Sequence, residues 1–136
     1  QHNNLSPSNI NIEITEGVFL AEENLSAWLS ESRKQGYKIV LDDFGTGYSS
    51  LSYLSKYPID KLKVDKSFVN NINHDPSARA IIRAMVGIAN AMNMKVVVEG
   101  IEHKEQYQAC LELGCDYGQG YLFSKPLKFE EIVEIL

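Results

Sequence analysis

The sequence contains no apolar run that approaches the roughly 18 residues of a membrane-spanning helix. Its polar start, Gln1 to Asn4, also lacks the charge and the apolar stretch of a secretion signal. Both absences predict a cytoplasmic segment without direct membrane contact. A longer parent protein would still be free to carry a membrane anchor in upstream domains.

Basic residues and cysteines are scarce as well. Thirteen Lys and Arg stand against eighteen Asp and Glu, giving a net charge of -5, which argues against binding of a nucleic-acid polymer. The two cysteines, Cys110 and Cys115, have no third ligand and no metal-type spacing. We interpret them as buried apolar thiols without a function.

What is present is the composition of a folded domain. Hydrophobic residues make up 44% and charged residues 23% of the 136 residues, close to the averages for soluble globular proteins. This length fits one domain, and no linker-like stretch divides it. We therefore treat residues 1–136 as one continuous piece.

Five short β-rich runs alternate with helical patterns along the chain. The runs are 9–15, 38–42, 61–64, 95–98 and 116–120. The clearest helix is predicted to begin at Asp75-Pro76, a capping residue followed by a proline in the first turn. Alternating strands and helices predict a parallel α/β sheet. A complete (β/α) barrel needs about eight such units and usually about 250 residues, so the chain is either a small open sheet or part of a barrel.

Each predicted strand carries or is followed by a polar side chain. Alternation along the first strand places Glu13 on the face opposite Ile12 and Ile14, which in a barrel would be the interior. Taken singly, such residues are more often helix caps or turn residues. Their recurrence at the same place in successive strands favours one shared site. The set is Glu13, Asp42, Asp43, Lys63, Glu99 and Gln119.

Four carboxylates and one ammonium in a common crevice would repel one another unless cations or protons relieve the charge. Oxygen ligands without His or Cys favour Mg²⁺ or Mn²⁺, with Ca²⁺ as a non-productive substitute. The adjacent pair Asp42 and Asp43 suits a two-metal site. Two metals about 3.5–4 Å apart can activate water for in-line displacement at phosphorus, so the pattern indicates phosphodiester hydrolysis.

These residues lie in motifs that resemble the EAL-domain phosphodiesterases, which hydrolyse the bacterial second messenger cyclic di-GMP. The matching runs are Glu13-Ile14-Thr15-Glu16 and the segments 42–51, 62–69, 98–102 and 118–126. They cover nearly the whole chain in the order and spacing of the family. A single Asp-Asp-Phe-Gly motif would be weak evidence, but the ordered set is specific.

The resemblance implies a modified, TIM-like (β/α) barrel and a role for each matching residue. Glu13, Asp42 and Asp43 match metal ligands, and Lys63 matches a lysine near the attacking water. Glu99 matches a residue interpreted in the family either as the general base or as a ligand of the second metal and its water. The implied cofactor is a pair of Mg²⁺ or Mn²⁺ ions, with Ca²⁺ inhibitory.

Three further residues match supporting positions. Glu16 matches the glutamate that steadies the loop at about 44–50, which in the family couples metal binding to dimerisation. Gln119 and Pro126 match residues that bind the substrate. The implied partners are cyclic di-GMP and a second copy of the domain in a homodimer.

The resemblance covers about the last five strand-helix units of an EAL domain. The name-giving Glu-Ala-Leu motif and the asparagine ligand that follows it belong to earlier strands, which this sequence does not contain. We expect residues 1–136 to be the C-terminal portion of a single EAL domain, whose parent converts cyclic di-GMP to linear pGpG. The isolated chain is expected to be inactive or weak.

Two other interpretations compete with this one. A non-catalytic EAL module would sense cyclic di-GMP or bind a protein partner, but such modules typically lose the Asp-Asp pair or the loop glutamate. A small open α/β domain would use its strand-end acids only as caps, which leaves the ordered motifs unexplained.

Overall fold

A computed structural model describes residues 6–18, 24–45, 51–128 and 131. The strands are β1 (Asn11–Thr15), β2 (Lys38–Phe44), β3 (Lys61–Val64), β4 (Lys95–Val98) and β5 (Tyr117–Gly118). The helices are η1 (Pro7–Asn9), α2 (Leu25–Lys34), α3 (Leu51–Lys56), α4 (Lys66–Asn70), α5 (Pro76–Ala91) and α6 (Lys104–Leu113). Strands and helices alternate as the sequence pattern predicts.

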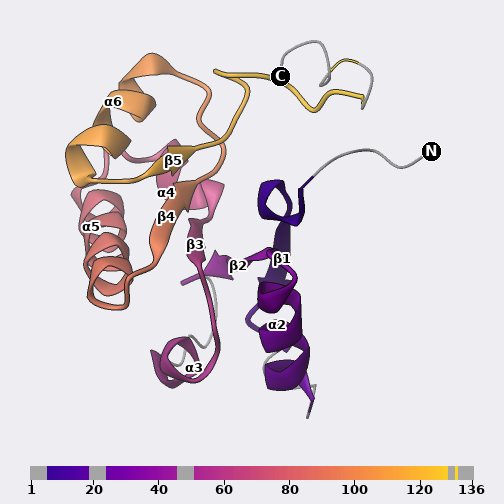
Figure 1. Ribbon diagram of the computed structural model, residues 1–136. Coiled ribbons are helices and arrows are strands. Elements are labelled where there is room, and N and C mark those ends of the chain that lie inside the picture. The colour runs from indigo at the N-terminus through magenta and orange to yellow at the C-terminus, as the bar shows by residue number, and fades with distance from the viewer. Residues whose placement is uncertain (1–5, 19–23, 46–50, 129–130, 132–136) are drawn as a thin grey trace.

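The five strands form one sheet in the order β1-β2-β3-β4-β5, and every neighbouring pair is parallel (Figure 1). Each strand therefore lies beside the next strand of the sequence, without the reversal of order that defines a doubly wound sheet. This is the winding of a (β/α) barrel. In the described part of the chain the sheet is not closed, and this sequential order together with the open sheet confirms the predicted partial barrel.

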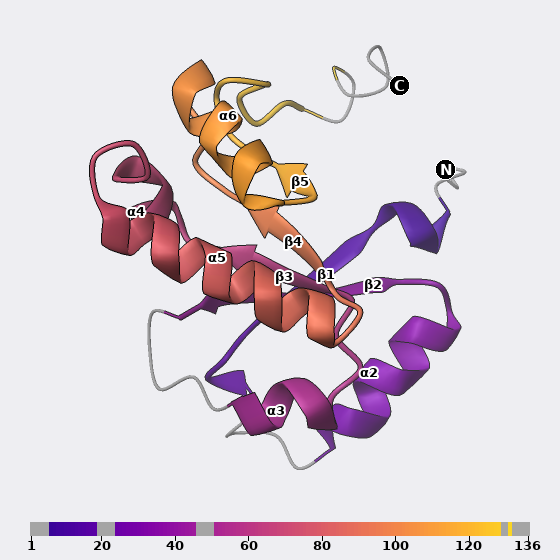
Figure 2. The same cartoon turned by 90° about the vertical axis from the view of Figure 1, so that its left-hand side faces the viewer.

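The longest helix covers the middle of the sheet. Helix α5 contacts β3 and β4 and runs across them in Figure 2. Asp75 caps the helix by accepting a hydrogen bond from the Ser77 amide at 2.8 Å, and Pro76 occupies the first turn. Ile82 is fully buried on its inner side. The predicted helix start is confirmed.

Alternation along the strands divides their side chains between two environments. On β3, Leu62 and Val64 are fully buried beneath the helices, and on β4 Val96 and Val98 are buried in the same way. Side chains of the opposite parity, such as that of Lys63, lie on the other face of the sheet. That face corresponds to the interior of a barrel, and it carries the polar side chains that follow.

Candidate metal and phosphodiester site

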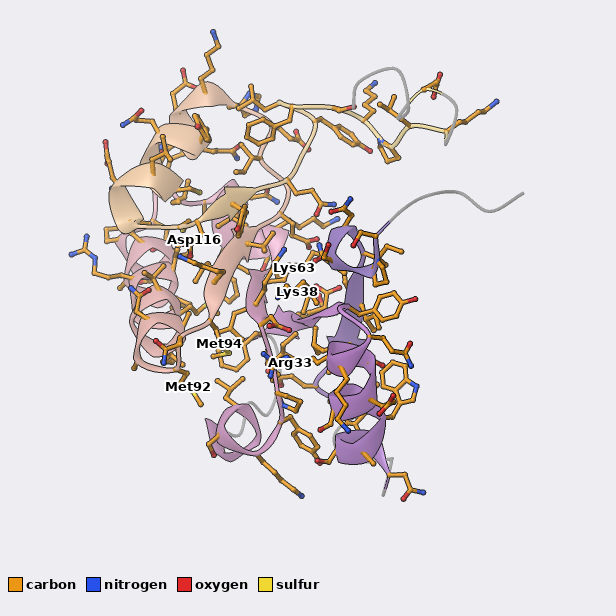
Figure 3. The ribbon with its side chains drawn as sticks, in the orientation of Figure 1. Arg33, Lys38, Lys63, Met92, Met94 and Asp116 are labelled. Carbon is orange, nitrogen blue, oxygen red and sulfur yellow. The ribbon has the colours of Figure 1, made fainter. Side chains whose placement is uncertain are left out.

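Lys63 connects three strands through ion pairs. Its ammonium nitrogen Nζ lies 3.0 Å from Glu13 Oε2, 3.3 Å from Asp42 Oδ2 and 3.2 Å from Glu99 Oε2. The Lys63 side chain is only 7% exposed, whereas that of Glu13 is 44% exposed. In Figure 3 Lys63 lies between β4 and β1, as these contacts require. The structure thus brings together four side chains that the sequence predicts to share one site.

The electrostatics of this group keep Lys63 charged. Burial by itself would lower the pKa of Lys63, but hydrogen bonds to Glu13 and Glu99 and the negative charge of both carboxylates raise it above the ordinary lysine value. The side chain therefore acts as a fixed cation near neutral pH and not as a base. Its positive charge offsets part of the mutual repulsion of the surrounding acids.

An irregularity in β2 separates the two adjacent aspartates. The register between β2 and β3 shifts between Leu41 and Phe44, and Asp43 adopts a left-handed backbone with φ of 56°. The Asp43 amide donates a hydrogen bond to Asp42 Oδ1 at 2.9 Å. A bulge of this kind redirects a side chain at a strand end. Asp42 consequently faces Lys63, while Asp43 turns towards the ends of β3 and β4.

Asp43 there meets two other acids. Carboxylate oxygens of Asp43, Asp65 and Glu99 all lie within 4.8 Å of one another. Such a spacing allows one oxygen from each residue to coordinate a common divalent cation, and hard cations prefer oxygen donors. The residues present therefore fit a Mg²⁺ or Mn²⁺ ion. Glu99 belongs both to this group and to the Lys63 group, which makes the two clusters continuous.

Asp65 is the member of this group that the sequence interpretation missed. It caps α4 by accepting a hydrogen bond from the Ser67 amide at 2.9 Å. Hydrogen bonding by the Ser67 side chain, together with that from the Ser67 amide, holds the pKa of the Asp65 carboxyl below its ordinary value against the effect of burial. The signal was available in the sequence, because Asp65 directly follows β3 just as Glu99 directly follows β4. Its capping role and its place in the acidic group coexist.

Gln119, which is predicted to line the substrate site, lies beside a cavity. Glu99 and Gln119 line one cavity of about 280 Å³ together with Lys66, Glu102 and Tyr121. The backbone holds Gln119 in place, because its amide donates to the Val98 carbonyl at 2.8 Å. Glu99 and Gln119 thus open onto the same space.

Pro126 does not join this arrangement. It is exposed in the segment after β5, and it is not among the residues that line the Glu99 cavity. Its predicted contact with substrate stays a prediction.

Glu16 contacts the start of the loop that it is predicted to steady. Its carboxylate oxygen Oε1 accepts a hydrogen bond from the Gly45 amide at 3.4 Å. The rest of that loop, residues 46–50, lies outside the described residues. The contact joins the segment after β1 to the end of β2, next to the aspartate pair.

Three carboxylates therefore surround the buried Lys63, and two more lie beside Glu99, towards the carboxyl ends of parallel strands. In barrel enzymes this end of the strands carries the functional site. The fold and the site together define a barrel-type α/β protein with an acidic site whose carboxylates fit a divalent cation.

The chain belongs to the EAL domain family, whose model matches residues 1–126. Among curated relatives, the cyclic di-GMP phosphodiesterase RocR of Pseudomonas aeruginosa is 38% identical over 131 residues, which cover 96% of this chain and 33% of RocR. The protein sll1895 of Synechocystis is 43% identical over 136 residues, or 19% of its own length. The chain thus spans a fifth to a third of these relatives.

Solved structures agree with this assignment. A cAMP-bound and cyclic-di-GMP-bound form of the EAL enzyme Bd1971 superposes with a TM-score of 0.89 and 41% identity, covering 97% of this chain and 35% of that one. A manganese and cyclic-di-GMP complex of Klebsiella pneumoniae BlrP1 gives a TM-score of 0.80 and 35% identity over 90% of this chain and 31% of that one. The predicted family is therefore confirmed.

Among the described residues, no helix is both long and apolar enough to cross a bilayer.

Proposed function

We propose that residues 1–136 are the C-terminal portion of one EAL domain, and that the full-length protein hydrolyses cyclic di-GMP to linear pGpG in the cytoplasm. The observation that carries this proposal is the pair of linked clusters around Glu99. On one side Glu99 pairs with Lys63 at 3.2 Å, and on the other it lies within 4.8 Å of Asp43 and Asp65. The relative RocR, 38% identical to this chain, is named a cyclic di-GMP phosphodiesterase.

The carboxylates offer two neighbouring places for cations. Asp43, Asp65 and Glu99 would hold one Mg²⁺ or Mn²⁺ ion, because their oxygens already converge. Glu13 and Asp42 would contribute to a second, together with the ligands expected from earlier strands of the domain. When bound, such a pair of cations polarises the phosphodiester and makes water a stronger nucleophile.

The residues of this chain have distinct parts in the reaction. Water adds to one phosphorus atom as the bond from that phosphorus to the ribose O3′ breaks, and the released O3′ takes up a proton. Glu99 either receives the proton of the water, or it would hold a cation and orient the water, whose proton is then released to solvent; both roles are consistent with its position. Lys63 stays protonated and balances the charge that grows on the phosphate, while Gln119 lines the cavity that receives the dinucleotide.

The isolated 136-residue chain is expected to turn over little cyclic di-GMP. The described sheet is open, and unpaired edge strands tend to seek partners. Two of the metal ligands implied by the family belong to strands outside this sequence. Activity is therefore proposed for the whole protein, and we propose that it acts as a homodimer through its EAL domain.

The proposal is tested on the full-length protein with cyclic di-GMP and either Mg²⁺ or EDTA. Chromatography should show pGpG forming only with the metal, and Asp42→Asn should abolish its formation while the circular dichroism spectrum is unchanged. Metal-independent cleavage, or full activity of Asp42→Asn, would contradict the proposal. Binding of cyclic di-GMP without any hydrolysis would instead identify the non-catalytic EAL module.

A further inference from the structure

The two cysteines flank the C-terminal end of α6, Cys110 in its last turns and Cys115 just after it. Helix α6 ends in a left-handed Gly114 with φ of 86°. The Cys115 amide donates to the Cys110 carbonyl at 3.1 Å, and the Gly114 amide donates to the Leu111 carbonyl at 3.0 Å. These two hydrogen bonds form a Schellman motif, which brings the side chains at its two ends into contact.

The two thiols share one environment. Cys110 and Cys115 are both free, and both line the same cavity. Interaction with the Cys115 thiol and the positive charge of Arg79 lower the pKa of Cys110 against the effect of burial, whereas interaction with Cys110 and burial raise the pKa of Cys115. One thiol is therefore the better nucleophile, and the other is placed to react with it.

A cavity gives small molecules access to the pair. Its volume is about 220 Å³, and both cysteines line it together with Leu111, Tyr107 and Phe123. The rings of Tyr107 and Phe123 pack edge to face, with 5.6 Å between their centroids, and form part of the cavity wall. Access matters because Cys110 itself is only 3% exposed. The cavity is distinct from the one beside Glu99 and Gln119, and no step of the proposed hydrolysis uses it.

The backbone around the pair is held firmly on the sheet. Asp116, the residue after Cys115, accepts hydrogen bonds from the Val96 amide at 2.9 Å and from Lys95 Nζ at 2.6 Å. Figure 3 shows Asp116 beside β5. A disulfide needs Cα atoms about 4.4–6.8 Å apart, and a helix end fixed in this way keeps the two cysteines close without closing a bond between them.

We propose that Cys110 and Cys115 form a redox-active dithiol site that exchanges with low-molecular-weight disulfides. In the first step the Cys110 thiolate attacks one sulfur of the small disulfide, forms a mixed disulfide and releases one small thiolate. In the second step Cys115, as its thiolate, attacks the Cys110 sulfur, closes the intramolecular disulfide and releases the second small thiolate. The protein loses two protons and two electrons, and the small disulfide becomes two thiols.

The test uses the reduced full-length protein and the neutral probe bis(2-hydroxyethyl) disulfide, with its thiol as the reducing partner. Mass spectrometry after digestion of the folded chain should show a peptide that links Cys110 to Cys115, about 2 Da, the mass of two hydrogens, lighter than its reduced form. The effective concentration of one thiol relative to the other, obtained from the equilibrium with the probe, should be at least about tenfold higher in the folded chain than in the same chain in urea. Equal values in both states, or thiols that stay reduced or end as two separate adducts, would overturn the proposal.

Two variants separate the helix-end geometry from the mere presence of two thiols. Cys115→Ser should stop at the mixed disulfide on Cys110 and never lose the two hydrogens. Gly114→Ala keeps both thiols, and its added Cβ would meet only Val86 Cγ1, at 3.6 Å, so its main effect is the strained positive φ. It should lower the effective concentration several-fold in the folded state but not in urea. An unchanged value in folded Gly114→Ala would contradict the role given to the Schellman motif.

Discussion

Lys63 is the residue on which the site is assembled, because its ammonium contacts acids from β1, from β2 and from the segment after β4. A lysine so nearly buried is tolerated only where partners compensate its lost hydration. The three carboxylates do so, and in return their repulsion is reduced. Lys63 thus has a structural role in the acidic cluster, beside the electrostatic role proposed for it in hydrolysis.

Replacing Lys63 by Met should destabilise the fold by about 1–3 kcal/mol at pH 7, because the three acids lose their shared cation. The loss is moderate because these acids are partly exposed and screened by solvent. The pKa of Lys63 is higher in the folded chain, so protonation favours folding. Its contribution is complete below the ordinary lysine value of about 10.4 and is lost as the pH rises through the raised value. Urea unfolding at pH 7, 9 and 10.5 should therefore show the largest wild-type advantage at pH 7 and 9.

Lys95→Met provides the control for this series. Lys95 lies on the neighbouring strand, with Lys61 opposite it, but its side chain is 59% exposed and pairs only with Asp116 among the described residues. Its replacement should change stability much less. Equal losses for both variants would contradict the account of Lys63 as a buried, shared cation.

The turns after the strands set the positions of the functional side chains. Gly120, directly after Gln119, has φ of 153°, and a Cβ there would overlap the backbone of Ile101. That backbone also accepts and donates the hydrogen bonds that fix this turn, with Ile101 donating to the Gln119 carbonyl at 3.1 Å and accepting from Leu122 at 3.0 Å. The glycine is needed because two backbones meet closely.

Gly120→Ala should therefore destabilise the chain by about 2 kcal/mol or more, through forced backbone movement. Gly87→Ala is the matched control, because Gly87 lies in α5 and a Cβ there would have no neighbour within 4 Å. That change should stabilise the helix by about 0.5–1 kcal/mol. Thermal unfolding of both variants measures the difference, and a neutral Gly120→Ala would refute the close approach.

Strand pairing was largely predictable from the sequence, whereas the fine geometry of the site was not. Alternation in 11–15 and the apolar run at 96–98 suffice to place Glu13 and Glu99 correctly. The β2 bulge is less visible, since Asp43 and Asp42 look alike in sequence and only the register with β3 reveals that they diverge. Asp65 was missed because its capping pattern is a sufficient explanation of an aspartate before a helix.

The sheet ends also differ from the sequence prediction. Strand β2 continues two residues beyond the predicted 38–42 because the bulge carries pairing on to Phe44. Strand β5 is shorter than the predicted 116–120. The Asp116 side chain accepts a hydrogen bond from the Val96 amide of β4, and the chain turns at Gly120. In both cases tertiary contacts decide where a strand ends.

The whole protein should distinguish Ca²⁺ from Mg²⁺. Ca²⁺ takes six to eight oxygen ligands at longer distances, about 2.3–2.6 Å, in flexible geometry, whereas Mg²⁺ requires near-octahedral coordination at about 2.0–2.1 Å. We expect Ca²⁺ to bind the carboxylates but to hold the reacting phosphate less well. Full-length protein saturated with Ca²⁺ should hydrolyse cyclic di-GMP at least about tenfold more slowly than with Mg²⁺, and equal rates would contradict the two-metal geometry.

The most direct test of the central claim is the rate of pGpG formation by the full-length protein and its Glu99→Gln variant, measured with saturating Mg²⁺. Glu99 joins the Lys63 ion pairs to the Asp43 and Asp65 group, so Gln should reduce the rate by about a thousandfold or more. Glu31→Gln, an exposed change on α2, should leave the rate unchanged. A Glu99→Gln variant that retains the wild-type rate would contradict the assignment of this cluster as the site of hydrolysis.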